Sequence, residues 1–181
     1  MGERQSMRAV LRVDYDHLLR LSLRPEGASL WWAVLSPRAL PVVLIRLAEA
    51  LYALKLGPLA SIVRLILLWG FRVEVPRGAV IGPGFVLPHP SGIVLGHAKI
   101  GCDVVVFQNV TLGARSFDGA YDLATRPTLE DRVIVGAGAV VLGCVTVGAD
   151  AVVAANSLVL NDVPSKHTAI GVPAQMSAKS K

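Results

Sequence analysis

The hydrophobic positions in the second half of the chain repeat every six residues. The repeat slips by one residue between Leu87 and Val94 and is interrupted between Leu112 and Leu129. A helix period of 3.6 cannot hold a register of six, and a plain strand period of 2 would not need glycines at fixed offsets. The pattern predicts a parallel β-helix, with one short strand and one turn per hexad. The column consists of Val75, Ile81, Leu87, Val94, Ile100, Val106, Leu112, Leu129, Val135, Val141, Val147, Val153 and Val159.

Three hexads would complete one triangular coil, so equivalent residues of successive coils would stack about 4.8 Å apart. We expect the column side chains to fill the axis, because no single coil can bury its own apolar face. Glycine often follows a column position and is expected to allow tight turns of positive φ between the faces. These glycines are Gly82, Gly101, Gly113, Gly136 and Gly148.

The pattern divides the chain into three parts. Residues 1–72 form a helical region, with helices expected at 41–56 and 58–69, each opened by proline and closed by Gly57 or Gly70. Residues 73–165 form the β-helix, and because the interruption is not a multiple of six, residues 114–127 leave it as a loop. Residues 166–181 form a C-terminal cap and tail.

Composition favours a cytoplasmic protein. Hydrophobic residues make up 53% of the chain and the mean hydropathy is +0.56, but residues 41–71 are divided by charges into segments far shorter than the roughly 20 residues of a membrane-spanning helix. The first twelve residues do not resemble a secretion signal. Cys102 and Cys144 form no disulfide framework, as expected in a reducing compartment. The apolar helical region leaves open a peripheral contact with the inner face of the membrane.

Four segments resemble the active-site region of serine acetyltransferases, a family of hexapeptide-repeat acyltransferases. They are residues 88–96 (PHPSGIVLG), residues 110–113 (VTLG) with the loop after them, residues 135–143 (VGAGAVVLG) and residues 171–174 (GVPA). The short helical region looks more like that of O-acetyltransferases from capsule and exopolysaccharide pathways, such as the colanic acid type. The resemblance implies a left-handed β-helix that transfers an acetyl group from acetyl-CoA to a hydroxyl.

The resemblance places His89 where the family keeps its general base. An alcohol attacks a thioester poorly unless a base with a pKa near 7 takes its proton, and imidazole suits that role. Glu74 matches the acidic position that begins the first coil, and its fifteen-residue separation from His89 is close to one coil. It would orient the imidazole and stabilise its cation. The alternative is that His89 is only a corner residue and Glu74 an exposed strand start.

The family binds coenzyme A in the groove between adjacent prisms of a trimer, so the resemblance implies a homotrimer. Small residues would let pantetheine lie flat on the coil, although tight coils alone also require small residues. His97 falls near an acidic position of the family and is a candidate for acceptor contact. The matching cofactor positions are Ala114, Arg115, Ala137 and Ala155, with Val172 and Pro173 near the adenine end.

Two departures from the serine enzymes bear on the acceptor. Pro88 stands where those enzymes have an acid beside the base, and Arg126 stands where their loop has a second histidine. Without these groups, we expect a saccharide or polysaccharide hydroxyl as the acceptor. Arg126 remains a candidate substrate-binding residue because it could bind a carboxylate, so the alternative function is L-serine O-acetylation for cysteine biosynthesis.

Functions of other classes fit less well. A zinc hydratase of the γ-carbonic-anhydrase type needs three converging imidazoles, but the four histidines carry no motif of that family, so no metal is expected. A non-catalytic trimeric scaffold would leave the Pro-His-Pro strand and the loop unexplained. The net charge of +5 is compatible with binding the phosphates of coenzyme A, and no nucleic-acid motif is present.

Overall fold

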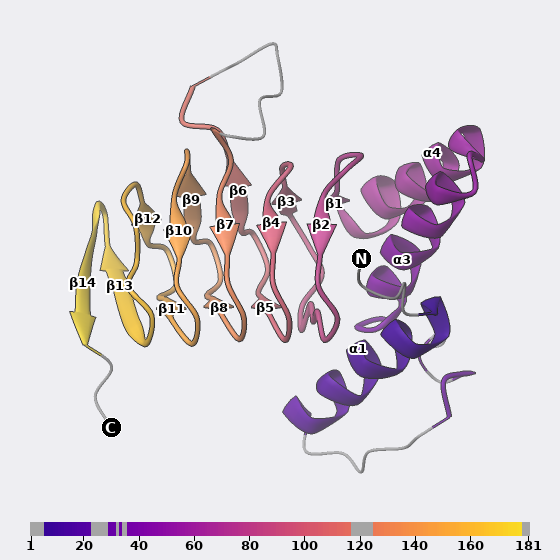
Figure 1. Ribbon diagram of the computed structural model, residues 1–181, viewed down its shortest axis with the longest axis horizontal. Helices are drawn as coiled ribbons and strands as arrows, with labels where there is room; N and C mark the ends of the chain where they lie inside the picture. The colour runs from indigo at the N-terminus through magenta and orange to yellow at the C-terminus, as the bar shows by residue number, and fades with distance from the viewer. Residues whose placement is uncertain (1–5, 23–28, 32, 34–35, 117–124, 179–181) are drawn as a thin grey trace.

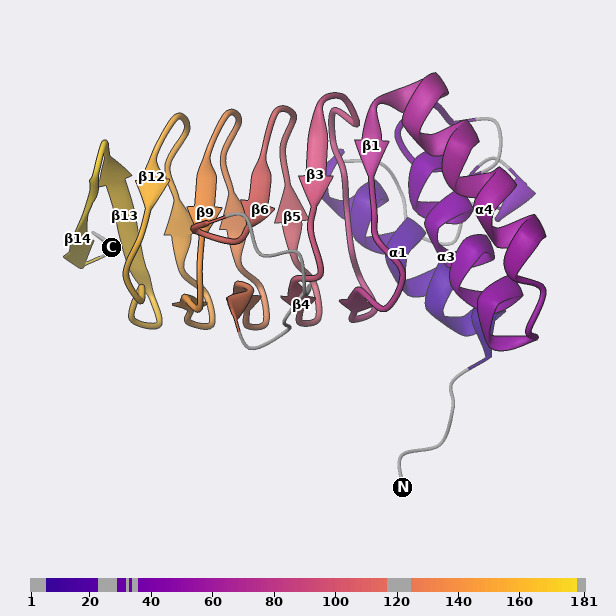
Figure 2. The same ribbon diagram turned by 90° about the horizontal axis from the view of Figure 1, so that it is seen from above.

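The chain folds into a parallel β-helix with a group of helices at one end (Figure 1, Figure 2). This computed structural model describes residues 6–22, 29–31, 33, 36–116 and 125–178. The mainly β fold expected from the six-residue repeat is therefore confirmed.

Three sheets form the faces of the prism, and successive coils pair in parallel. Sheet A contains β1 (Val73–Glu74), β3 (Ile93–Leu95), β6 (Thr111–Gly113), β9 (Val140–Leu142) and β12 (Leu158–Val159). Sheet B contains β2 (Val80–Ile81), β4 (Lys99–Ile100), β7 (Thr128–Leu129) and β10 (Thr146–Val147). Sheet C contains β5 (Val105–Val106), β8 (Ile134–Val135), β11 (Val152–Val153), β13 (His167–Gly171) and β14 (Ala174–Ala178).

The aliphatic column fills the axis of the prism, with one exception. Most of its members are fully buried, and Val75 and Ile81 at the first coil are partly buried against the same core. The prediction for Val94 is wrong. Ile93 and Leu95 point inward and are fully buried, and Val94 between them is only partly buried. Side chains alternate along a strand, and the residue that pairs with the column residue Leu112 is Leu95, eight residues after Leu87 and one residue beyond the predicted Val94.

Glycines of the repeat are required by close stacking of coils. Gly136 does not have a positive φ, but a Cβ built there would lie 2.7 Å from the Ala155 nitrogen and 2.9 Å from the Val153 oxygen. A Cβ on Gly101 would lie 2.8 Å from the backbone carbon of Glu130. The expected reason, turns of positive φ, is thus wrong for these two positions, because the next coil occupies the space of the side chain.

Helices α1, α3 and α4 and one π-helical turn, all within the described residues, precede the first strand. Helix α1 begins at Met7, where Ser6 accepts a hydrogen bond from the Ala9 amide as its N-cap. Gly57 begins a helix instead of ending one, and Lys55, with φ 61°, makes the preceding turn. The elements are α1 (Met7–Leu21), α3 (Leu40–Ala53), α4 (Gly57–Ile66) and the π-helical turn η1 (Leu67–Phe71).

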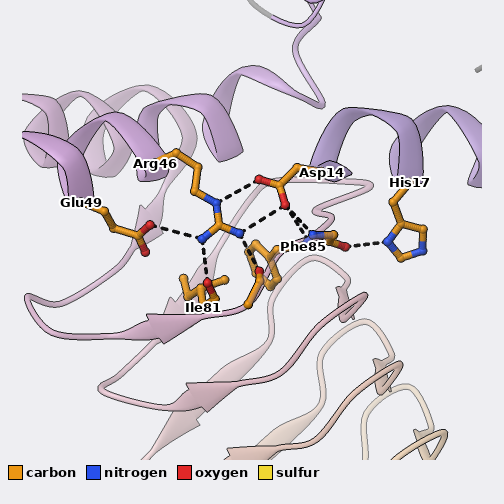
Figure 3. Close-up of polar contacts among 8 residues, drawn as sticks. Asp14, His17, Arg46, Glu49, Ile81 and Phe85 are labelled. Atoms are coloured by element: carbon orange, nitrogen blue, oxygen red, sulfur yellow. Dashed lines mark hydrogen bonds and ion pairs between the residues drawn. The ribbon is translucent and has the colours of Figure 1, made fainter. Parts of the chain in front are cut away.

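A buried ion pair fastens the helices to the first coil (Figure 3). Asp14 of α1 accepts hydrogen bonds from Arg46 of α3, at 2.9 and 3.2 Å, and from the Gly84 and Phe85 amides, at 2.7 and 2.9 Å. Arg46 also donates to the Ile81 carbonyl, at 2.8 Å. Burial by itself would lower the pKa of Arg46, but hydrogen bonding and the charge of Asp14 raise it above its usual value. The two charges pair with each other and also bond to backbone groups of the first coil, so these contacts hold α1, α3 and the first turn together.

A hairpin closes the other end of the prism. Strand β13 pairs in parallel with β11, continuing sheet C, but β14 turns back and pairs with β13 in the antiparallel sense. The stack therefore ends in a strand of reversed direction at the edge of sheet C (Figure 1). In the described residues, no helix is both long and apolar enough to cross a membrane.

Candidate active site

His89 lies on a short turn that links a buried residue of one face to β3 of the next. Leu87 and Ile93 on either side are fully buried, so the turn is anchored at both ends while the imidazole remains exposed. The Ser91 amide donates to the His89 carbonyl at 2.9 Å. Gly92 has φ 67°, and a Cβ there would lie 2.3 Å from Asn109 Oδ1, so glycine is needed for the turn to pack on the next coil.

At the corner between sheets C and A, backbone hydrogen bonds link the turns of the coils that follow His89. The Gly138 amide donates to the Gln108 carbonyl, and the Asn156 amide donates to the Ala137 carbonyl, each at 2.9 Å. The predicted cofactor residues Ala137 and Ala155 therefore follow one another along the corner that begins with His89. Because their side chains are small, they would not obstruct an extended ligand bound along this corner.

Phe107 stands beside the imidazole and was not foreseen from the sequence. The centroids of the His89 and Phe107 rings are 6.3 Å apart, with the planes tilted by 39°. Phe107 is itself partly buried, so it gives one side of the imidazole an apolar wall. The signal in the sequence was an aromatic residue directly after the column residue Val106, at the turn one coil after His89.

Glu74 lies on the same face of the prism but does not bond directly to His89. It is exposed on β1, and its Cα pairs with that of Val94 in sheet A, a few residues after the His89 turn. No hydrogen bond or ion pair links the two side chains in the described chain. The role of Glu74 in orienting the imidazole thus remains a prediction.

Ala114 and Arg115 lie at a different edge, where the chain leaves β6. They line an open hollow together with Gly143 and Cys144 of the next coil and the segment 160–162. The Arg115 guanidinium donates a hydrogen bond to the Leu160 carbonyl. These two predicted cofactor residues are therefore separated from Ala137 and Ala155 by the width of sheet A.

The two candidate acceptor residues are placed differently. Arg126 directly precedes β7 and is only 8% exposed, and its Nη1 donates to Thr125 Oγ1 at 2.9 Å. His97 is partly buried just after β3. Much of the loop predicted at 114–127 lies outside the described residues.

Val172 and Pro173 form the exposed turn between β13 and β14, where they are joined by a cis peptide bond. Val172 is among the most exposed aliphatic residues of the described chain. Cys144 is exposed and Cys102 partly buried, and both are free. In the described part of the chain, no group of histidine, cysteine and acidic side chains is arranged to hold a metal ion.

Comparisons with known proteins identify the family of the chain. The family of bacterial transferase hexapeptide (six repeats) matches residues 126–161. A serine acetyltransferase of Helicobacter pylori strain J99 is 35% identical over 174 residues, which are 95% of this chain and 100% of the relative. The chain belongs to the serine acetyltransferase family. It is accordingly a hexapeptide-repeat acyltransferase, and its β-helix is left-handed, as in the structures of that family.

Two solved structures show how closely the serine acetyltransferase fold is followed. Soybean serine acetyltransferase in complex with serine superposes with a TM-score of 0.83 at 32% identity, covering 95% of this chain and 70% of that one. A serine acetyltransferase in complex with coenzyme A gives 0.81 at 30% identity, with the same coverage. These relatives favour the alternative acceptor, L-serine, over the saccharide that Pro88 and Arg126 suggested, and they give no support to a role in polysaccharide synthesis.

Proposed function

We propose that this protein transfers the acetyl group of acetyl-CoA to the hydroxyl of L-serine. The observation that carries the proposal is the match to a Helicobacter pylori serine acetyltransferase along that enzyme's whole length, at 35% identity. The exposed, anchored imidazole of His89 supports it, because the resemblance of residues 88–96 to the family assigns the general base to that residue.

The chemistry assigned to His89 is proton transfer. Its free imidazole nitrogen would accept the serine hydroxyl proton as the oxygen attacks the thioester carbon, and would return that proton to the departing thiolate of coenzyme A. Phe107 limits the directions the ring can take. Glu74, on the same face, would stabilise the imidazolium formed on the way.

Arg126 is the group we assign to the serine carboxylate. A guanidinium can hold a carboxylate through two parallel hydrogen bonds, and such charge-assisted bonds are about twice as strong as neutral ones. Because Arg126 is almost completely buried, an anion bound there would be well shielded from water. The replacement of a family histidine by arginine would then keep serine recognition rather than remove it.

The candidate residues would work as part of a homotrimer. Ala137 and Ala155 form an open edge on a single prism, and a second prism is needed to wall a groove for coenzyme A. The hexapeptide-repeat fold of the family supports such side-by-side packing. Light scattering should give three times the 19.1 kDa chain mass, and a monomer would overturn the assembly.

The acceptor is tested by measuring release of free coenzyme A with L-serine, against a panel of sugars and nucleotide sugars at saturating acetyl-CoA. We expect L-serine to be the preferred acceptor, with kcat/KM within the usual enzymatic range of about 10⁴–10⁸ M⁻¹s⁻¹. D-serine and L-alanine are matched controls, since the first reverses the stereochemistry and the second lacks the hydroxyl. A sugar that outcompetes L-serine would refute the proposal and restore the saccharide acceptor.

A further inference from the structure

The helical end presents an apolar surface that the described chain leaves uncovered. Ile62 is 53% exposed, Leu65 52% and Trp69 81%. The opposite side of the same helix is buried through Ala60 and Val63, so α4 is apolar on both sides. We name the outward surface the α4 face: Leu59, Ile62, Leu65, Ile66, Leu68 and Trp69.

The α4 face lies at one extremity of the molecule. Figures 1 and 2 both place α4 at the outer edge of the helical end, away from the stacked strands. Its inner side packs on α3. An apolar surface in this position faces outward instead of contributing to the core, and contiguous exposed patches of this kind mark interaction sites.

Charge is distributed unevenly along the chain, and the excess lies at this end. Residues 1–77 contain eleven lysines and arginines against six acidic residues, whereas residues 78–181 contain seven of each. The whole net charge of +5 therefore belongs to the first segment. Residues 50–73, which include all of α4 and η1, contain Lys55, Arg64 and Arg72 but no acidic residue.

We propose that the α4 face docks on the surface of an anionic phospholipid bilayer. An apolar helix face flanked by basic residues is the arrangement that binds at a membrane interface, with its apolar side chains in the headgroup and acyl boundary. Lys55 and Arg72 are exposed at the two ends of the face, where they can pair with lipid phosphates. Trp69, the most exposed member, has the amphipathic ring that favours this boundary.

The same charges disfavour a second copy as the occupant. Pairing two molecules through their α4 faces would bring together two segments that each have a net charge of +5. In the homotrimer of the proposed function, on which this step rests, three-fold symmetry would direct all three α4 faces toward one plane. A flat anionic surface could then engage the three faces together and gain affinity by multivalency.

The test is flotation of the full-length protein with vesicles of phosphatidylglycerol and phosphatidylcholine, compared with vesicles of phosphatidylcholine alone. We expect binding to the anionic vesicles that weakens as salt is raised. The double variant L65Q/W69Q should reduce partitioning by at least about tenfold, since two large apolar side chains no longer enter the interface. The matched control is Ile170→Gln, which changes a residue 56% exposed at the opposite end of the molecule and should bind like wild type.

Light scattering and L-serine acetylation are measured on the same samples. Failure of the wild-type protein to float with anionic vesicles overturns the proposal, as does equal binding by L65Q/W69Q. A wild-type hexamer that this double variant converts to a trimer would identify a second copy as the occupant and also overturn it. Acetylation activity should be unchanged in the variant, so loss of docking and failure of the proposed enzymatic function give separate readouts.

Discussion

At the scale of single residues, His89 carries the clearest expectation. Replacing His89 with Ala should lower kcat for acetyl transfer by about 10²-fold or more, because the hydroxyl loses its general base, while KM for acetyl-CoA changes little. The measurement is coenzyme A release under steady-state conditions. His167→Ala, which removes an imidazole bonded to the nearby Ser165 carbonyl, is the control and should retain full turnover. Equal turnover by the two variants would exclude His89 from the reaction.

Substitutions at Arg126 and at Arg115 are expected to affect the KM values of different substrates. Arg126→Lys retains the charge but loses the two-pronged geometry, so KM for L-serine should rise about tenfold or more with KM for acetyl-CoA unaffected. Arg115→Ala, at the hollow beside Cys144, should instead raise KM for acetyl-CoA. Steady-state kinetics with each substrate varied in turn separates the two effects. The assignments fail if both variants raise the same KM.

At the scale of secondary-structure elements, a buried ion pair contributes to the attachment of the helices, beside the apolar contacts of α3 and η1 with the core of the prism. Asp14 and Arg46 are 4% and 5% exposed, so removing one member leaves the other charge buried and uncompensated. Arg46→Met should therefore reduce the free energy of unfolding by about 3–5 kcal/mol. Thermal denaturation measures this, with Arg132→Gln as the control, because it breaks the exposed pair with Asp150 and should change stability far less. If both variants had similar melting temperatures, the buried pair would not be what holds the helices to the first coil.

Glycines of the repeat offer a second contrast between elements. Gly136→Ala should destabilise by about 1–3 kcal/mol, because the new methyl group overlaps the backbone of the next coil. Gly57→Ala, at the first residue of α4 with no atom within 4 Å of the added Cβ, should be neutral or stabilise by about 0.4–1 kcal/mol. Melting temperatures of the two variants should thus move in opposite directions, and a parallel shift would contradict the stacking argument.

The elements themselves were predictable to different degrees. The six-residue repeat was sufficient for the β-helix, because every coil repeats the same burial requirement. It misplaced Val94, because counting residues across a turn that contains an insertion does not show which of the following residues points inward. The bounds of α1 were not predicted within the helical region, because its apolar side is interrupted by Asp14, which is typical of a surface position until Arg46 is placed opposite it.

At the scale of the whole molecule, sequence reasoning reached the reaction class but not the acceptor. His89 lies at the turn where the repeat slips, so it was chosen through the resemblance of residues 88–96 to the family and not through the repeat. The acceptor was inferred from Pro88 and Arg126 alone, and the positions of two residues along the chain do not reveal which substrate they would bind. Two substitutions relative to the family were read as the loss of serine recognition, whereas the relatives favour serine.

The reversed strand β14 has a consequence for how the protein stays in solution. A coil whose neighbours are identical in outline can be extended by any further coil, so an open end is a template for polymerisation. The helices cover the first coil, and the antiparallel β14 covers the edge of sheet C at the last. A chain shortened to end at Gly171 should therefore associate tail to tail through its open last coil, because the helices still cover the first coil, and light scattering should give twice the mass of the full-length particle. The small terminal hairpin would then be the part of the chain that keeps two such ends from pairing.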